Sequence, residues 1–219
     1  MRTLAILPIK SFDDAKQRLA HELNSSTRRV LAEAMFSDVL VALRRTPSIS
    51  EIVVVTADHG AQRIAAGYGA TVLDDNDEGQ NVAASNGVQQ ALRSGAERVL
   101  LVPGDCPLLD PKDLEQLIAR PVGDRSVLII PDRHGTGTNA LLLTPPDAMT
   151  PAFGPGSCQR HVYSARVAGA VPEVVEFASL ALDVDTPADL ALVQTTLAAS
   201  IGGAARTRGM LNQLTRSLA

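Results

Sequence analysis

Short apolar runs alternate, in the first half of the chain, with longer stretches in which apolar residues recur every three or four positions. The short runs are rich in Val, Leu and Ile and show no apolar–polar alternation. This pattern is typical of parallel strands that are buried on both faces. We predict four such strands, at residues 3–9, 51–56, 70–73 and 98–102.

The segments between these runs have the spacing of amphipathic helices. We predict helices at residues 25–45, 59–67 and 80–94. Ser25 or Ser26 is the expected N-cap of the first, and Asp110 followed by Pro111 predicts the start of another helix. Strand–helix units joined by short connections indicate a Rossmann-like three-layer α/β/α sandwich.

The second half of the chain is less regular. Strands are expected at residues 126–130, 140–144 and 173–177. The polar turn at 131–139 suits an antiparallel neighbour, so the sheet is predicted to be mixed but mostly parallel. The glycine-rich loop at 153–161 leads into a helix. In LALDVDTPADL, residues 180–190, a strand is expected to end and a helix to begin, with Thr186 as its cap.

Composition narrows the class of protein. The chain has 219 residues, of which 45% are apolar and 20% charged, and its formal net charge is −4. These values predict one globular domain, residues 1–199, and argue against a nucleic-acid partner. The tail at 200–219 is a candidate helix, disordered segment or homodimer contact. Cys106 and Cys158 fit neither a zinc site nor a disulfide framework, and no apolar run reaches the ~18 residues that span a membrane, so we expect a cytoplasmic protein.

Candidate chemistry begins directly after the first predicted strand. The segment LPIKSFDDAKQRL, residues 7–19, carries Lys10, Lys16 and Arg18 but no glycine. A nucleotide-binding loop at this place often uses glycines to bring backbone N–H groups to the phosphates. The three cations are therefore candidates for a side-chain anion site, although solvated surface charge is the plainer interpretation.

Three carboxylates follow later predicted strands. Asp105 follows the strand at 98–102, and Asp183 and Asp185 lie two residues apart, so on an extended segment their side chains leave the same face. Ligands of open α/β sheets bind beyond the carboxyl ends of the strands. An all-oxygen set there suits Mg²⁺. Turn chemistry for Asp105 and helix capping for the other two acids are the structural alternatives.

Two glycine-rich stretches are candidate substrate cradles. GTGTN, residues 135–139, combines backbone freedom with two hydroxyls, and Gly154 to Ser157 leads into a helix N-terminus that favours a carboxylate or phosphate. An ordinary turn and an ordinary cap are equally simple explanations. We expect His134 and His161 to be structural or surface residues rather than metal ligands.

Six motifs in order resemble a known family. They are LPIKSFDDAKQRL, GQNVA (79–83), PGDCPLL (103–109), DRHGTGTNALLL (132–143), FGPGS (153–157) and LDVDTPADL (182–190). Together they are similar to the guanylyltransferases of deazaflavin coenzyme F-420 biosynthesis, which act on 2-phospho-L-lactate or phosphoenolpyruvate. The resemblance covers roughly residues 3–197, and each motif alone is weak.

The resemblance implies a nucleotidyltransferase fold, GTP as a substrate and a divalent metal ion, expected to be Mg²⁺. It also implies a phosphorylated three-carbon acid whose phosphate attacks the α-phosphorus of GTP, with release of pyrophosphate. A downstream transferase that uses the labile product is the implied partner. The residues carried over are Asp105, Asp183 and Asp185 for the metal; Thr138, Gly154 and Ser157 for the acid; Lys10, Lys16 and Arg18 for the triphosphate; and Gly79 and Asn81 near the guanine.

Some choices stay open. Gln80 stands where the family carries Leu, Cys106 follows the metal Asp where the family varies, and no motif covers the tail. Phosphoenolpyruvate is the favoured acid, with 2-phospho-L-lactate and 3-phosphoglycerate as alternatives that share its carboxylate and phosphate. A nucleotidyltransferase for molybdopterin or sugar nucleotides, and a non-catalytic nucleotide-binding module, are the competing functions.

Overall fold

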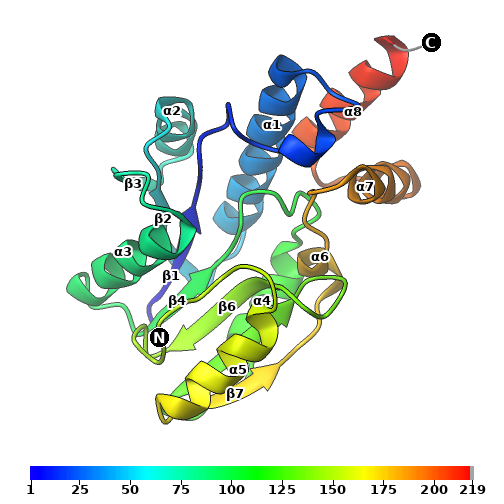
Figure 1. Cartoon of the computed structure of the whole chain (residues 1–219). Helices are drawn as coiled ribbons and strands as arrows, with labels where there is room; N and C mark the ends of the chain where they lie inside the picture. The colour runs from blue at the N-terminus through cyan, green and yellow to red at the C-terminus, as the bar shows by residue number, and fades with distance from the viewer. Residues whose placement is uncertain (218–219) are drawn as a thin grey trace.

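A computed structural model describes residues 1–217 of the chain, which form one seven-stranded sheet with helices on both faces (Figure 1). The strand order is β3-β2-β1-β4-β6-β5-β7, and β6 runs antiparallel to its neighbours β4 and β5. The strands are β1 Thr3–Pro8, β2 Ile49–Val55, β3 Thr71–Leu73, β4 Arg98–Leu101, β5 Ser126–Pro131, β6 Thr138–Thr144 and β7 Val171–Val174. The predicted mostly parallel, mixed α/β/α sandwich is confirmed.

The helices divide between the two faces of the sheet. Side chains of α1, α2, α4 and α6 join the core on one face, and those of α3 and α5 join it on the other. A short 3₁₀ helix at Gln17–Leu19 follows β1, and α7 and α8 lie at one end of the sheet near α1 (Figure 1). The helices are α1 Ser25–Arg44, α2 His59–Gly67, α3 Gln80–Arg93, α4 Pro111–Ala119, α5 Ser157–Val167, α6 Ala178–Ala181, α7 Pro187–Ala199 and α8 Ala205–Ser217.

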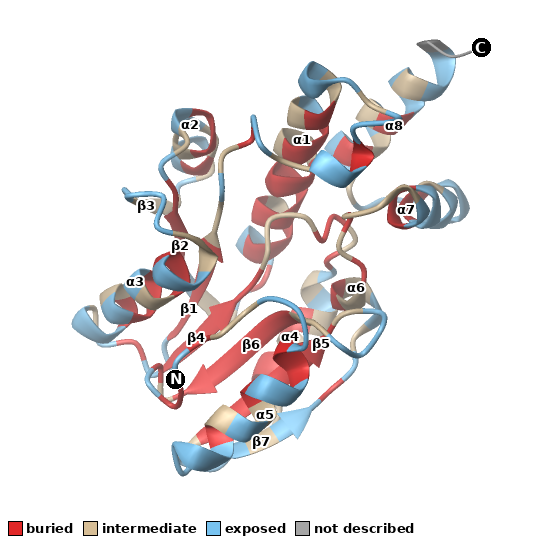
Figure 2. Ribbon diagram, viewed as in Figure 1, coloured by how far each residue is buried: buried red, intermediate tan, exposed pale blue. Residues whose placement is uncertain are grey.

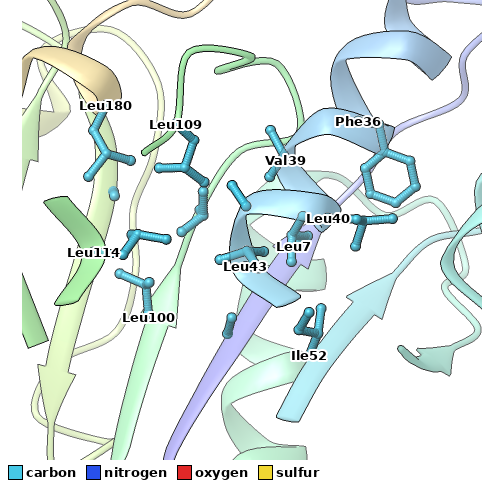
Figure 3. Packing of buried hydrophobic residues seen from close by; sticks show 14 of the residues in the cluster. Leu7, Phe36, Val39, Leu40, Leu43, Ile52, Leu100, Leu109, Leu114 and Leu180 are labelled. Carbon is cyan, nitrogen blue, oxygen red and sulfur yellow. The ribbon is translucent and has the colours of Figure 1, made fainter. Parts of the chain in front are cut away.

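The central strands are buried on both faces, as their unbroken apolar runs predict. On β1, Ala5 and Leu7 pack under α1, whereas Leu4 and Ile6 face α3. Figure 3 shows Leu7 beneath the α1 side chains, and Figure 2 shows the inner strands buried while the edge strand β7 is largely exposed. With 3% aromatic residues, this core is built almost entirely from aliphatic side chains.

A third apolar cluster lies at the α7–α8 end of the molecule. It joins Leu19 of the 3₁₀ helix, Met35 of α1 and Leu211 of α8 to Leu182 and Val184, which flank Asp183. The segment that carries Lys16 and the segment that carries Asp183 and Asp185 thus pack on the same apolar cluster. Because Leu211 belongs to this cluster, packing of α8 stabilises both candidate-site segments.

Four local predictions were wrong. The strand at 70–73 was expected to be buried on both faces, but β3 lies at the edge of the sheet and its residues are only partly buried. Asn24, not Ser25 or Ser26, caps α1, because its side chain accepts a hydrogen bond from the backbone N–H of Thr27. The strand expected to end at the DVD segment is absent from the described residues: residues 178–181 are helical, and an extended segment that belongs to no strand leads from there to Asp183. The strand expected at 173–177 lies earlier, at β7, because Phe177 serves as the N-cap of α6.

The C-terminal tail is helical over α8, and its last two residues, 218 and 219, lie outside the described residues. The buried carboxylate of Asp38 in α1 accepts hydrogen bonds from the backbone N–H groups of Arg206, at 3.2 Å, and Thr207, at 2.8 Å. A side chain of another helix therefore caps the start of α8. None of the helices within residues 1–217 combines the length and apolar character needed to cross a membrane.

Removing this cap should destabilise the protein measurably. Asp38→Ala leaves two backbone donors without their acceptor, so we expect the free energy of unfolding to fall by about 1–2 kcal/mol. Urea denaturation followed by circular dichroism measures the difference. Asp124→Ala, at an exposed position, is the matched control and should change stability by less than about 0.5 kcal/mol. Equal effects of the two substitutions would contradict the capping role.

Candidate active site

A cleft of about 540 Å³ opens beyond the carboxyl ends of β1 and β4. The segments that line it are the cationic loop after β1, the turn at 103–105, the start of β6, the glycine-rich loop before α5 and the acidic segment before α7. Nine of the eleven predicted site residues line the cleft: Lys10, Lys16, Arg18, Asp105, Thr138, Gly154, Ser157, Asp183 and Asp185. Gly79 and Asn81 are the two that do not, although their neighbour Gln80 does.

Lys16 lies between two of the acids. Its ammonium donates to Asp105 Oδ2 and, at 3.1 Å, to Asp185 Oδ1. Its side chain is only 8% exposed, whereas Arg18, 3.6 Å from Asp185, is 72% exposed. The backbone of Lys16 is left-handed, with φ 56° and ψ 40°, which is uncommon for a residue with a side chain. This backbone bend accompanies the inward turn of one cation out of the three.

The charges of the cluster shift one another's pKa values. Burial lowers the pKa of Lys16, but the carboxylates of Asp105 and Asp185 outweigh that effect and raise the pKa above its ordinary value. Burial, together with the negative charges of Asp105 and Asp185, raises the pKa of Asp183 to about 6. Three carboxylates with one buried ammonium leave an excess of negative charge, which favours a further cation.

The donor set fits a hard divalent cation in its chemistry. All three side chains offer carboxylate oxygens, and Asp105 Oδ1 is buried with no hydrogen-bond partner, so it is available as a ligand. Across residues 1–217, however, no three His, Cys, Asp or Glu side chains are already gathered as metal ligands. Lys16 Nζ supplies the positive charge between Asp105 and Asp185 in this arrangement.

The residues predicted to bind the phospho-acid, Thr138, Gly154 and Ser157, line the same cleft, and we call this part of its lining the acid wall. Gly154 and Gly156 have positive φ values of 122° and 69°, which let the loop turn sharply into α5. Ser157, the first residue of α5, is buried and its hydroxyl has no hydrogen-bond partner. Thr138 begins β6, and its hydroxyl lies 2.9 Å from Nδ1 of His161. The backbone N–H groups of Ser157 and Cys158 already donate to the carbonyls of Gly154, at 3.0 Å, and Thr136, at 3.1 Å. It is therefore the unpaired hydroxyl of Ser157 that suits an anionic ligand.

Asn81 contacts protein backbone rather than the cleft. Its amide accepts from the N–H of Phe153, at 2.7 Å, and donates to the carbonyl of the same residue, at 3.2 Å. Gly79 is the N-cap of α3 and has φ 105°. The α3 start is thereby tied to the loop that forms the acid wall. The predicted contact of these two residues with guanine stays a prediction.

Sequence reasoning missed several contacts that shape the site. Asn139, next to Thr138, donates to Asp183 Oδ1 at 3.2 Å. Arg133 forms an ion pair of 2.7 Å with the buried Asp189, whose carboxylate also accepts from the backbone N–H of Asp185 at 3.1 Å. These contacts join the 131–139 turn to the acidic segment. No sequence signal pairs residues so far apart, although Asp189 is recognisable as the third helical position after the Thr186 cap.

Comparisons with known proteins find relatives over most of the chain. The profile of the family described as "Guanylyl transferase CofC like" matches residues 3–201. The chain is 56% identical over 219 residues to the phosphoenolpyruvate guanylyltransferase of Conexibacter woesei, covering 99% of this chain and 98% of that protein. It is 37% identical over 195 residues to the 3-phospho-D-glycerate guanylyltransferase of Colwellia psychrerythraea, covering 88% and 91%.

A solved nucleotidyl transferase structure from Methanothermobacter thermautotrophicus matches with a TM-score of 0.65 and 18% identity, covering 91% of this chain and 99% of that one. At that identity the likeness concerns the fold. It supports the α/β/α architecture and carries no statement about ligands.

Proposed function

The chain belongs to the family of CofC-like guanylyl transferases, and from this premise we propose that it joins GMP from GTP to phosphoenolpyruvate and releases pyrophosphate. The observation that carries the proposal is the single cleft in which cations, three carboxylates and an anion cradle meet. The 56% identity to a phosphoenolpyruvate guanylyltransferase supports this choice of acid. We further propose that the reaction belongs to coenzyme F-420 biosynthesis.

The cationic segment is proposed to bind the triphosphate. Lys10 and Arg18 line the cleft from the exposed side and can neutralise phosphate oxygens, while the buried Lys16 can exchange a carboxylate for a phosphate contact. Positioning and charge stabilisation supply most of the catalysis in phosphoryl-type transfer. Gly79 and Asn81, with the adjacent cleft residue Gln80, are proposed to lie on the guanine side.

Asp105, Asp183 and Asp185 would hold a divalent metal, proposed to be Mg²⁺. When bound, that ion supplies charge neutralisation and orientation at the α-phosphate of GTP. The protein residues set up the displacement by aligning the two substrates. An oxygen of the acid's phosphate forms a bond to the α-phosphorus, the bond to the β-phosphate oxygen breaks, and pyrophosphate leaves with its electron pair.

The reaction needs no nucleophile or general base from the protein. A phosphate monoester loses its second proton near pH 6, so the attacking oxygen of the acid is already ionised at neutral pH. Thr138, Gly154 and Ser157 are proposed to hold the acid so that this oxygen faces the α-phosphorus.

Pyrophosphate release by the purified protein tests the proposed function. The reaction contains Mg²⁺ and GTP with phosphoenolpyruvate, 2-phospho-L-lactate or 3-phosphoglycerate, each with and without the downstream transferase and its deazaflavin precursor. We expect release with phosphoenolpyruvate and GTP, none with ATP, and none without an acid. Release with a different acid would correct the substrate, and no release with any acid would overturn the assignment. Hand-over to the downstream transferase, a homodimer contact through the tail and a cytoplasmic location stay predictions.

A further inference from the structure

His161 makes a hydrogen bond at each ring nitrogen while fully buried behind the acid wall of the cleft. The backbone N–H of Ala152 lies 2.9 Å from Nε2, and the hydroxyl of Thr138 lies 2.9 Å from Nδ1. The ring also packs edge-on against Phe153, with a centroid separation of 5.3 Å. His161 therefore links α5 to the start of β6 and to the loop at 152–157.

These partners determine which nitrogen carries the proton. Burial, with the nearby charge of Arg160, lowers the pKa of His161 to about 4, so the ring is neutral at physiological pH. A backbone N–H can only donate, so Nε2 must be the acceptor and the ring proton must lie on Nδ1. Nδ1–H then donates to Thr138 Oγ1.

The consequence falls on the hydroxyl of Thr138. Because its oxygen already accepts from the histidine, its own proton must point in another direction. Thr138 lines the cleft, as does Ser157, whose buried hydroxyl has no hydrogen-bond partner. A hydroxyl that accepts from His161 and can donate into the cleft is suited to bind a ligand oxygen that carries no proton.

We propose that His161 is a positioning residue that fixes the hydroxyl of Thr138 as a hydrogen-bond donor to an anionic oxygen of the phospho-acid. This inference rests on the proposed function. It assigns no contact between the histidine and the substrate, because the ring lies behind Thr138. Since the candidate acids all carry a carboxylate and a phosphate, the arrangement serves binding of any of them rather than choice among them.

The loop that orients His161 is itself held by hydrogen bonds to two helices. Ala152, which anchors Nε2, precedes Phe153, whose backbone N–H and carbonyl are both held by Asn81 of α3. Arg160 also donates to the Ala152 carbonyl, with Nε at 3.0 Å and the terminal nitrogen at 2.9 Å. Asn81 of α3 and Arg160 of α5 thus hold the loop that places the Ala152 N–H at Nε2. The tautomer of His161 is therefore set without the substrate.

Two substitutions separate the nitrogens of His161. In His161→Asn the amide NH₂ replaces Nδ1–H and keeps the donor to Thr138, whereas in His161→Gln the amide oxygen replaces Nε2 and keeps only the acceptor for Ala152. We expect His161→Gln to raise the KM for the acid about tenfold, as for one lost hydrogen bond to a charged group, and His161→Asn to raise it less than about threefold. The KM for GTP should be unchanged in both.

A double-mutant cycle with Thr138→Val shows whether the histidine acts through the threonine. In the Thr138→Val background, His161→Gln should cause no further rise in the KM for the acid. Nitrogen NMR of the wild-type histidine ring should show the proton on Nδ1. Equal KM effects of the two histidine variants, additive effects in the cycle, or a proton on Nε2 would overturn the inference while leaving the proposed function intact; an inactive wild-type protein would overturn both.

Discussion

Asp105→Asn should reduce turnover by at least about 100-fold while changing the dissociation constant of GTP by less than about tenfold. The substitution keeps the shape of the side chain but removes its charge. It takes away a carboxylate oxygen that is buried and free to bind a cation, and it takes away one of the two acids paired with Lys16. The loss should therefore fall mainly on charge stabilisation in the transition state.

Steady-state pyrophosphate release measures turnover, and calorimetric titration with GTP in the absence of the acid measures binding. Asp14→Asn is the matched control, because Asp14 also lines the cleft but is exposed. Its kcat should stay within about threefold of the wild type. Unchanged turnover in Asp105→Asn would remove Asp105 from the mechanism and, with it, the proposed metal site.

Lys16→Met should lower both stability and activity. The Lys16 side chain is 8% exposed and places its charge between Asp105 and Asp185, so its removal leaves Asp105 without its cation and Asp185 with only the exposed Arg18, at 3.6 Å. Breaking a fully buried pair costs about 3–5 kcal/mol, but Asp185 is 46% exposed, so we expect a loss of about 2 kcal/mol in the free energy of unfolding. We expect kcat/KM for GTP to fall by at least about 100-fold.

The effect of Mg²⁺ on the stability of Lys16→Met tests whether a metal ion can replace the missing ammonium. Added Mg²⁺ should raise the urea midpoint of Lys16→Met more than that of the wild type, because a bound cation would replace the missing ammonium. Lys10→Met is the matched control: Lys10 is exposed, so stability should change by less than about 0.5 kcal/mol while the KM for GTP rises. A Lys16→Met protein as stable and as active as the wild type would show that the buried ion pairs have no functional role.

The inner strands and their burial could be predicted because the local sequence carries both. Runs such as Leu4–Leu7 are apolar at every position, and a strand covered by helices on both faces is where such a run is stable. The rim of the sheet was inferred from the strand ends, which explains why Lys16 and Asp105 could be expected on the same rim from the sequence. Neither inference needs knowledge of which distant residues meet.

The errors arose where tertiary packing decides between similar local patterns. The apolar residues before Asp183 suit a strand, yet Leu180 packs under β5 and β6 as part of α6, and Leu182 turns toward the α7–α8 cluster. The Val184 N–H donates to the Asp105 carbonyl, but this single backbone hydrogen bond does not make the segment a strand of the sheet. The expectation that Asp183 and Asp185 leave the same face does not depend on a strand, because residues two apart point the same way in any extended segment, whether or not it pairs with a neighbouring strand.

Side-chain partnerships were beyond the reach of the sequence. The pairing of Lys16 with Asp105 and Asp185 accompanies a left-handed backbone at Lys16. Glycine or Asn usually marks that conformation in a sequence, and this position has neither. Asn81 was expected near guanine, yet its amide is paired with the backbone of Phe153, 72 residues away. Contacts of this kind arise from the fold and have no local pattern.

Phosphorus NMR of a reaction containing GTP, phosphoenolpyruvate, Mg²⁺ and the purified protein would be the most direct measurement. Attack of the acid's phosphate on the α-phosphorus predicts free pyrophosphate together with a new diphosphate ester whose two phosphorus signals are coupled to each other. GMP with pyrophosphate would instead identify water as the nucleophile, and GDP with inorganic phosphate would place the attack at the γ-phosphorus. Either of those results would contradict guanylyl transfer to the acid.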